Sequence, residues 1–259
     1  MKAVNIGFMG GCLNNQKGIA KDEFYYEVFS GLLSNVPHHV FTSIYISYDT
    51  MVAKTEKFIE INNIDVLFLV IRQFPLMPLY KPLIKYENKN GGTSWMIHPS
   101  LFRRKMGWNP GLSKYHTMNE YVYKKKRRFG LRDMNLLAGM ALGLFKWAPG
   151  FVLQEVIKVN ELCKNKGVKL IVLSTQQFPT SIMGNVVCKR ISYELETSFE
   201  QASIDYVNII HLGPPDYFAD DLVHFSAGCH HLIANILYEE FTRLGYGMKV
   251  NMTNNEVMV

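Results

Sequence analysis

Short apolar runs alternate along the chain with longer stretches in which apolar residues recur at helical spacing. The first kind is typical of buried strands and the second of amphipathic helices. Residues 65–71 form a continuous apolar run, as expected for a central parallel strand that is covered on both faces. The predicted strands are 4–9, 39–46, 65–71, 168–173 and 205–210, and the predicted helices are 23–33, 50–62, 150–166, 181–203 and 226–244.

Two of the predicted helices have apolar residues at a spacing that indicates which side faces the core. We expect both sets of side chains to be buried against the rest of the protein. They are Phe24, Val28 and Leu32 in the first helix, and Ala53, Phe58 and Ile61 in the second.

The predicted strands and helices alternate in an order that implies right-handed crossovers between parallel strands. This order predicts an α/β fold with a doubly wound, five-stranded parallel sheet of the flavodoxin-like type. In such sheets, ligands bind beyond the carboxyl ends of the strands. We therefore look for functional residues where the predicted strands end.

Residues 74–148 interrupt the alternation after the third predicted strand. The segment is rich in Pro, Gly, Tyr, Trp, Lys and Arg. A connection of this length inside a compact domain is uncommon unless it has a function or structure of its own. We expect one domain over residues 1–259, with 74–148 as a cap-like basic and aromatic insertion over the active site. The alternative is a peripheral decoration, such as an oligomer contact.

The composition is that of a globular protein, since 48% of the residues are hydrophobic and 19% are charged. The first predicted strand begins at Val4, which leaves no room for a signal peptide, and no apolar stretch is long enough to span a bilayer. We therefore expect a cytoplasmic protein without a membrane span. The net charge is +6. The basic run at residues 124–128 is typical of a solvated face, and less often of a site for nucleic acid, anionic lipid or an acidic carrier protein.

The strongest local signal for chemistry lies directly before the last predicted helix, where Asp221 is followed three residues later by His224. A carboxylate in this position can accept the Nδ1 proton of the imidazole, which fixes the tautomer and leaves Nε2 to act as a general base. The alternative is that Ser226 caps the helix while Asp221 and His224 are merely exposed. The context of the motif favours the first interpretation.

The Asp-x-x-His motif, followed by a small-residue turn and a closing apolar helix, resembles the last sequence block of the SGNH (GDSL-like) hydrolases. In that family the acid and the base of the catalytic triad are three residues apart, so the resemblance implies these roles for Asp221 and His224. The family's nucleophile lies just after the first strand, in a glycine-aspartate-serine turn. Here that strand ends Gly10-Gly11-Cys12, and the resemblance therefore implies that Cys12 is the nucleophile.

Several positions depart from the family pattern around the oxyanion hole. Gly11 stands where the family has the aspartate beside the nucleophile. The second block of the family supplies a glycine N–H, and here Ser47 or Tyr48 would have to supply the donor. The third block, glycine-x-asparagine, corresponds to a segment in which the Gln73 amide or the Arg72 guanidinium would stabilise the oxyanion.

Cysteine is a credible nucleophile for acyl transfer, because it is intrinsically more nucleophilic than serine and exchanges readily with thioesters. The alternative for Cys12 is a small buried apolar side chain. The other cysteines, Cys163, Cys188 and Cys229, lack the spacing of a zinc site or a disulfide framework, and we expect thiols. The histidine pair at 230–231 is expected on a helix face or the surface, and not at a metal.

These residues predict an acyl hydrolase or acyltransferase that forms a covalent acyl intermediate on Cys12 and needs no metal or organic cofactor. Its partner would be an acyl-bearing small molecule or an acyl-carrier domain. One alternative keeps the fold without the reaction, as a non-catalytic SGNH-like binding protein for an acylated or sugar ligand. Another is a nucleic-acid-binding protein that uses residues 124–128, which requires an affinity that falls steeply with salt and is not expected.

Overall fold

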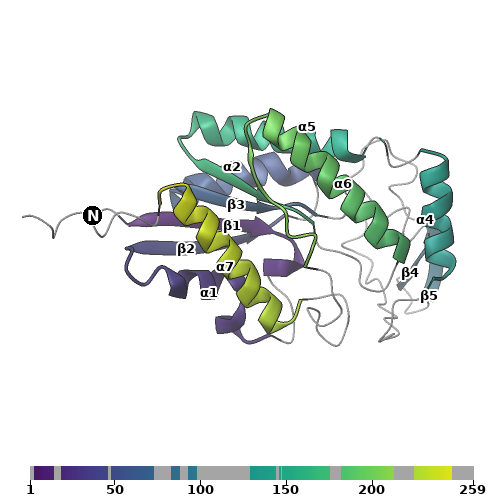
Figure 1. Cartoon of the computed structure of the whole chain (residues 1–259), viewed down its shortest axis with the longest axis horizontal. Coiled ribbons are helices and arrows are strands. Elements are labelled where there is room, and N and C mark those ends of the chain that lie inside the picture. Colours follow the sequence, from purple (N-terminus) through teal and green to yellow (C-terminus); the bar gives the residue numbers. More distant parts are fainter. Residues whose placement is uncertain are drawn as a thin grey trace, which may run out of the picture.

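The computed structural model describes residues 3–14, 19–45, 48–72, 83–87, 93–97, 129–143, 146, 148–175, 182–212 and 225–246. Five parallel strands form the central sheet, in the order β2-β1-β3-β6-β7 (Figure 1). Their bounds are Val4–Gly10 for β1, His38–Ile44 for β2, Val66–Val70 for β3, Lys169–Leu173 for β6 and Asp205–Val207 for β7. The predicted α/β fold with a five-stranded parallel sheet is confirmed.

The last strand of the sheet is shorter than predicted and ends at Val207 rather than at residue 210. Beyond it, the backbone N–H of Ile209 donates to Ser174 Oγ (2.8 Å) and that of Ile210 donates to Asn208 Oδ1 (3.1 Å). Side chains therefore satisfy the N–H groups that a longer strand would offer to its neighbour.

Helices cover both faces of the sheet, as Figure 1 shows. Helices α1 (Tyr25–Leu32) and α7 (Ala227–Arg243) lie on one face, and α2 (Met51–Asn62), α5 (Ala148–Asn165) and α6 (Ile182–Gln201) lie on the other. Successive residues of a strand point to opposite faces, so β1 contributes Phe8 to the core beneath α1 and α7 and Met9 to the core beneath the other three helices.

The buried face of α1 differs from the prediction. Phe24 is buried as expected, but Leu32 is 37% exposed, and the helix buries Tyr25 and Phe29 completely. In this helix two apolar stripes lie side by side, and the one that faces the sheet and α7 starts one residue later than predicted.

The buried face of α2 was also predicted in part only. Phe58 is buried, whereas Ala53 is exposed and Ile61 is 66% exposed. The helix instead buries Thr55, whose hydroxyl donates to the Met51 carbonyl (2.8 Å). Because this internal hydrogen bond satisfies the hydroxyl, a polar residue can occupy a core position.

The segment between β3 and α5 has structure that the sequence patterns did not predict. Strands β4 (Leu83–Glu87) and β5 (Thr93–Ile97) form an antiparallel hairpin apart from the main sheet. Helix α4 (Leu131–Ala141) lies beside α6. Within the described parts of the chain, no helix is long and apolar enough to cross a membrane.

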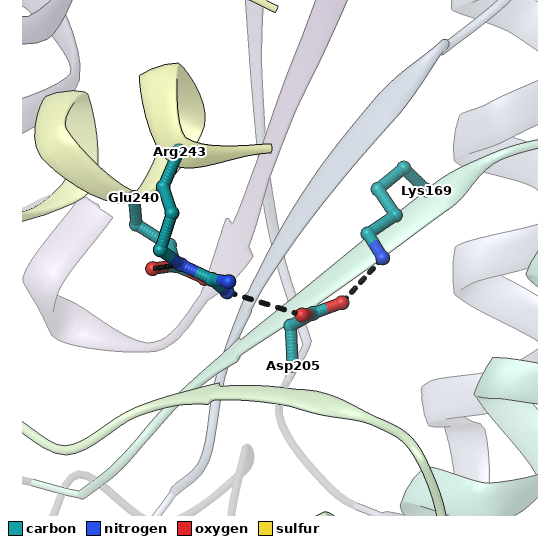
Figure 2. A network of polar contacts seen from close by, with 4 residues as sticks. All are labelled: Lys169, Asp205, Glu240 and Arg243. Atoms are coloured by element: carbon teal, nitrogen blue, oxygen red, sulfur yellow. Dashed lines mark hydrogen bonds and ion pairs between the residues drawn. The ribbon is translucent and has the colours of Figure 1, made fainter. Parts of the chain in front are cut away.

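A polar network joins the amino ends of β6 and β7 to the last turn of α7 (Figure 2). Asp205 contacts Lys169 and lies 3.5 Å from the Arg243 guanidinium, which also pairs with Glu240 at 2.5 Å. The Arg243 side chain is 63% exposed, so the network contributes little to stability. It lies at the edge of the sheet opposite to the carboxyl ends, where functional residues are expected.

Candidate active site

The candidate site lies at the carboxyl end of β1, the strand between β2 and β3. The chain leaves β1 toward the face covered by α1 and leaves β3 toward the opposite face. This arrangement makes the β1–β3 border the topological switch point, where ligands bind in open α/β sheets. At this point β1 runs into Gly11 and a short 3-10 helix, η1 (Cys12–Asn14).

Asn14 fixes the turn that contains Cys12 to the sheet. Its side-chain amide is only 4% exposed and donates from Nδ2 to the carbonyls of Phe8 (2.9 Å) and Ser43 (3.1 Å). Its Oδ1 accepts a hydrogen bond from the Tyr25 hydroxyl (2.6 Å). Because Asn14, the last residue of η1, is hydrogen-bonded to both β1 and β2, the backbone of η1 has a defined position at the end of the sheet.

Tyr25 continues this connection to the first turns of α7. Its backbone N–H donates to Nδ1 of His230 (3.2 Å), a side chain with no exposed surface. Burial raises the pKa of Tyr25 far above its usual value, so the hydroxyl stays protonated and remains a donor to Asn14. A hydrogen-bonded chain therefore links η1 to α7. The pair at 230–231 lies on a helix, as one of the two expected positions has it, but His230 faces the core and not the surface.

The residues that follow Cys12 and His224 belong to one buried cluster. Leu13 is 5% exposed and Phe225 is fully buried, and both pack in the core beneath α1 and α7. Ser226 caps α7 by accepting a hydrogen bond from the Cys229 N–H (3.3 Å), as the alternative interpretation of the motif expects. In the structure, the residue that follows each of the two predicted catalytic positions is therefore buried in the same core.

The Arg72 side chain lies directly over Gly11. A Cβ atom added to Gly11 would lie 2.8 Å from Nε of Arg72, so the glycine leaves the space that the arginine occupies. The guanidinium donates to the Tyr45 carbonyl (2.5 Å) and sits 5.9 Å from the centre of the Tyr45 ring. Of the predicted oxyanion and substrate-binding residues, the structure brings Gly11 and Arg72 together.

Two buried tyrosines form hydrogen bonds with the backbone at the end of β3, just before and at Arg72. The hydroxyl of Tyr45 donates to the Val70 carbonyl (2.7 Å), and that of Tyr48 donates to the Arg72 carbonyl (2.9 Å). Burial raises the pKa of both phenols, which keeps them protonated as donors. Tyr48 was a sequence candidate for the oxyanion hole, and in the structure its hydroxyl holds the end of β3.

Ser174 connects the ends of β6 and β7. Its hydroxyl is buried, accepts from the Ile209 N–H and donates to the Thr175 carbonyl (3.2 Å). The chain that follows Ile209 leads toward the segment with the predicted acid and base. Ser174 therefore fixes the start of that segment at the same edge of the sheet as Gly11.

Several sequence-predicted site residues lie outside the described part of the chain. They are Ser47, Gln73, Asp221 and His224. For Cys12 the structure describes the backbone in η1 but not the side chain.

The other three cysteines are buried thiols in the helical layers. Burial raises the pKa of Cys163 and of Cys229 to about 12 and that of Cys188 even further. These thiols stay protonated at neutral pH and are shielded from solvent, so they are poor nucleophiles. Among the described residues, no three His, Cys, Asp or Glu side chains gather closely enough to hold a metal ion.

The sequence patterns missed the residues that position the site. These residues are Asn14, Tyr25, Tyr45 and Ser174. Each acts through a hydrogen bond to a backbone or side-chain group that is far away in the sequence, so hydrophobic periodicity contains no signal for it. The one signal available in the sequence was position, since Asn14 and Ser174 are polar residues that follow shortly after predicted buried strands.

No protein-family model and no curated protein sequence matches the chain. Solved structures do match it. TesA aligns over 93% of this chain and 99% of its own, with a TM-score of 0.55 and 10% identity. A member of the lipolytic protein G-D-S-L family from Veillonella parvula aligns over 93% of this chain and 100% of its own (TM-score 0.52, 12% identity). A mutant of Axe2, an acetyl-xylooligosaccharide esterase from Geobacillus stearothermophilus, aligns over 92% and 93% (TM-score 0.54, 12% identity). The chain therefore has the fold of the GDSL-type lipolytic proteins and esterases, which is the fold that the sequence resemblance predicts.

Proposed function

We propose that this protein is an acyl hydrolase or acyltransferase that works through a covalent acyl intermediate on Cys12. The substrate is an ester or thioester carried by a small molecule or by an acyl-carrier domain. The proteins that share the fold include an esterase named for an acetylated oligosaccharide, which supports an ester as the substrate. The reaction requires no metal or organic cofactor, because the nucleophile, the base and the oxyanion donors are all protein groups.

The observation that carries this proposal is the shared core beneath Leu13 and Phe225. Cys12 directly precedes Leu13, and His224 directly precedes Phe225. Adjacent Cα atoms are about 3.8 Å apart, so each proposed catalytic position lies next to a residue of this core. The Phe225 ring lies 6.5 Å from the His230 ring, centroid to centroid, which supports an arrangement of His224 near the turn that contains Cys12. The chain of hydrogen bonds from Asn14 through Tyr25 to His230 supports the same proximity.

In the proposed mechanism, His224 takes the proton of the Cys12 thiol, and Asp221 orients the imidazole. The thiolate attacks the acyl carbonyl and forms a C–S bond. When the tetrahedral intermediate collapses, the bond to the leaving group breaks and the imidazolium returns its proton to that group. Water or a second alcohol or thiol, deprotonated by His224, then attacks the thioester and releases Cys12.

Arg72 is the described residue best suited to hold charge during these steps. Its guanidinium lies over Gly11, the neighbour of Cys12, and a fixed positive charge favours both a thiolate and a developing oxyanion. Gln73 and the backbone N–H groups near Cys12 would supply further donors. We propose that Arg72 replaces part of the oxyanion hole whose usual glycine is absent.

We also propose that residues 74–148 form a cap within a single domain over 1–259. The described parts of this segment, the β4–β5 hairpin and α4, supply structure beyond a plain loop. A cap would receive the acyl group or its carrier and limit the access of water, which selects between hydrolysis and transfer.

The experiment that tests the function is intact-mass spectrometry after incubation with a panel of acyl thioesters and activated esters. We expect an acyl adduct on the wild type, no adduct on Cys12→Ala, and slow formation on His224→Ala. Cys188→Ala is the matched control, because it removes a buried thiol and leaves Cys12 intact.

A complete absence of adduct and of turnover, together with a Cys12 that thiol reagents do not label, would contradict the proposal. That result would instead support a non-catalytic protein that binds an acylated or sugar ligand. An adduct that persists in Cys12→Ala would place the nucleophile elsewhere.

A further inference from the structure

The two edges of the central sheet differ in length and in charge. At one edge, β7 has three residues and begins with Asp205, which contacts Lys169 and Arg243 (Figure 2). At the other edge, β2 has seven residues and contains no Asp, Glu, Lys, Arg or Pro. Short edge strands and charged or proline residues are the devices that keep a sheet edge from pairing with another chain. β7 has two of these devices, and β2 has none within its length.

The hydrogen bonds to β1 show which backbone groups of β2 point away from the sheet. The Pro37 carbonyl accepts from the Val4 N–H (2.9 Å), and the Tyr45 N–H donates to the Gly10 carbonyl (3.0 Å). Backbone groups point alternately to the two sides of a strand, so the odd-numbered residues of β2 bond to β1. The even-numbered residues, whose N–H and C=O groups point outward, are His38, Val40, Thr42 and Ile44.

These outward groups form an open hydrogen-bonding edge. Within the part of the chain that the structure describes, the Ile44 carbonyl is the only one of these backbone groups with a partner, the exposed Lys54 Nζ at 3.4 Å. Thr42 is exposed and Val40 is partly exposed, so a further strand can reach this edge. An edge strand of this length without protective charges is a template for strand addition.

A second copy of β2 matches this edge when the two strands run antiparallel and a twofold axis passes through Phe41. Val40 then stands opposite Thr42 of the second copy, and His38 stands opposite Ile44 of the second copy. In an antiparallel ladder, such facing residues exchange two N–H···O=C bonds, so all four outward residues find partners. Because the strand contains no Asp, Glu, Lys or Arg, no such charges face each other across the axis.

The exposed apolar side chains near the two ends of β2 also complement each other. Leu32 (37% exposed) lies in the last turn of α1, and Ser30 in the same turn places it beside the start of β2, since Ser30 Oγ is 2.7 Å from His38 Nε2. Ile44 (38% exposed) points to the same face of the sheet as Val40, which packs in the core beneath α1 and α7. In the antiparallel arrangement the start of one strand meets the end of the other. Leu32 of each copy therefore approaches Ile44 of the other copy.

We propose that this protein forms a twofold-symmetric dimer through β2, in which the two parallel sheets join into one continuous sheet. A second copy fits better than an unrelated extended segment, because the hydrogen-bonding groups and the apolar ends match under the same twofold axis. Dimers of this symmetry are the commonest soluble homo-oligomers. The carboxyl ends of the strands point in opposite directions in the two copies, so the two candidate sites lie on opposite sides of the dimer and neither covers the other.

The test is analytical ultracentrifugation of the full chain over a range of concentrations. We expect the wild type to sediment as a dimer that dissociates on dilution. Thr42→Lys places one lysine in each copy on the same face of the sheet, about 7–8 Å apart across the axis, and should raise the dimer dissociation constant by at least about tenfold. Thr42→Pro should raise it as well, because it removes an outward N–H. That N–H does not bond to β1, and proline is tolerated at such positions of an edge strand.

Amide hydrogen exchange, followed residue by residue by NMR, identifies the surface that is used. In the dimer the Val40 N–H bonds to the second copy and should exchange slowly. In Thr42→Lys, at a concentration where this variant is monomeric, the same N–H faces water and should exchange at least about tenfold faster. The Phe41 N–H points to β1 in both forms and serves as the internal reference.

The matched control is Thr197→Lys, which makes the same change at an exposed residue of α6, the helix that packs beside β7 at the opposite edge of the sheet. It should sediment as the wild type does. Circular dichroism will verify that each variant is folded.

A wild type that sediments as a single chain up to millimolar concentration overturns the proposal. So does a dimer that Thr42→Lys leaves intact, or one in which the Val40 N–H exchanges as fast as in the monomeric variant, because the contact then lies on another surface. Slow exchange of Val40 in a monomer would show that a segment of the same chain covers β2, and it overturns the proposal too. None of these outcomes depends on acyl transfer, so they are independent of the function proposed for Cys12.

Discussion

β1 ends at Gly10 and Gly11 follows it directly, and these two glycines have different neighbours. A Cβ atom on Gly10 would lie 3.1 Å from Cβ of Val70 and 3.2 Å from Oδ1 of Asn14, in the buried core. A Cβ atom on Gly11 would meet the Arg72 side chain, which is partly exposed and can move. The structural cost of a side chain should therefore be larger at the first position and the functional cost larger at the second.

We predict that Gly10→Ala lowers the free energy of unfolding by about 1–3 kcal/mol, as overpacking in a core does. Gly11→Ala should lower it by only about 1 kcal/mol, the contribution of the Arg72 hydrogen bond that it displaces. Urea unfolding of the two variants, measured side by side, checks the order. A larger loss for Gly11→Ala would mean that Arg72 is held rigidly in place.

Arg72 allows a second prediction, on the reactivity of Cys12. Replacing Arg72 by Gln removes a positive charge beside the turn that carries the thiol, and the thiolate loses stabilisation. The rate of alkylation of Cys12 at neutral pH should fall by about threefold to tenfold. Arg72→Lys retains the charge without the planar fork and should lie between the two. An unchanged rate in Arg72→Gln would show that the guanidinium does not act on the thiol.

At the scale of elements, Asp133 joins two helices through one carboxylate. Its Oδ2 accepts from the Gly130 N–H (2.9 Å) at the start of α4, and its Oδ1 accepts from the Met183 N–H (2.7 Å) at the start of α6. Both N–H groups belong to helix termini that lack backbone partners. One side chain thus anchors the segment after β3 to the main α/β body.

We predict that Asp133→Ala lowers the free energy of unfolding by at least about 2 kcal/mol, because two N–H groups lose their acceptor. Asp133→Asn keeps one acceptor oxygen and should lose less. Asn135→Ala is the control, since this residue is exposed on the same helix. If denaturant unfolding gives Asp133→Ala the same midpoint as Asn135→Ala, the carboxylate is not the anchor.

The sequence predicted correctly those elements whose buried residues form a recognisable pattern of neighbouring apolar positions. A parallel strand covered on both faces must be apolar throughout, and β3 and β6 were found for that reason. Helix α1 shows the limit of the method: Phe24, Val28 and Leu32 have the same spacing as Tyr25, Phe29 and Leu33, and only packing on α7 selects the second stripe. Helix α4 was missed because its apolar residues do not lie on one face: Leu136 is buried beside the carboxylate of Asp133, while Met134 and Leu137 are exposed.

The candidate site divides in the same way. Gly11 and Cys12 after the first strand, and Arg72 after the third, became candidates because the apolar runs located the ends of these strands and the resemblance to the SGNH hydrolases implied roles there. Asn14 and Tyr45 were not assigned roles, since their partners lie in other strands. Their roles depend on how the strands are paired across the whole sheet, and the spacing of apolar residues along the sequence gives no information on that pairing.

At the scale of the whole molecule, buried thiols make stability depend on alkaline pH. Burial raises the pKa of Cys163 and of Cys229 from an ordinary value of 9.0 to about 12. Above pH 9 the unfolded chain releases these protons while the folded chain keeps them. The unfolded state then binds fewer protons than the folded state, so the free energy of unfolding falls as pH rises.

We predict that the contribution of these thiols is fully present below their ordinary pKa of 9.0 and is lost as the pH rises toward about 12. Each buried thiol should add a slope of about 1.4 kcal/mol per pH unit once its unfolded form is ionised. Urea unfolding between about pH 8 and about pH 10 covers the onset of this loss of stability, below the range where most unfolded tyrosines ionise.

Cys163→Ala should be less stable throughout because of the cavity it leaves, but its stability should fall less steeply with pH, because one titrating group is gone. A slope that does not change in Cys163→Ala would mean that other groups cause the alkaline loss, and the same measurement on Cys229→Ala then tests whether the second thiol contributes.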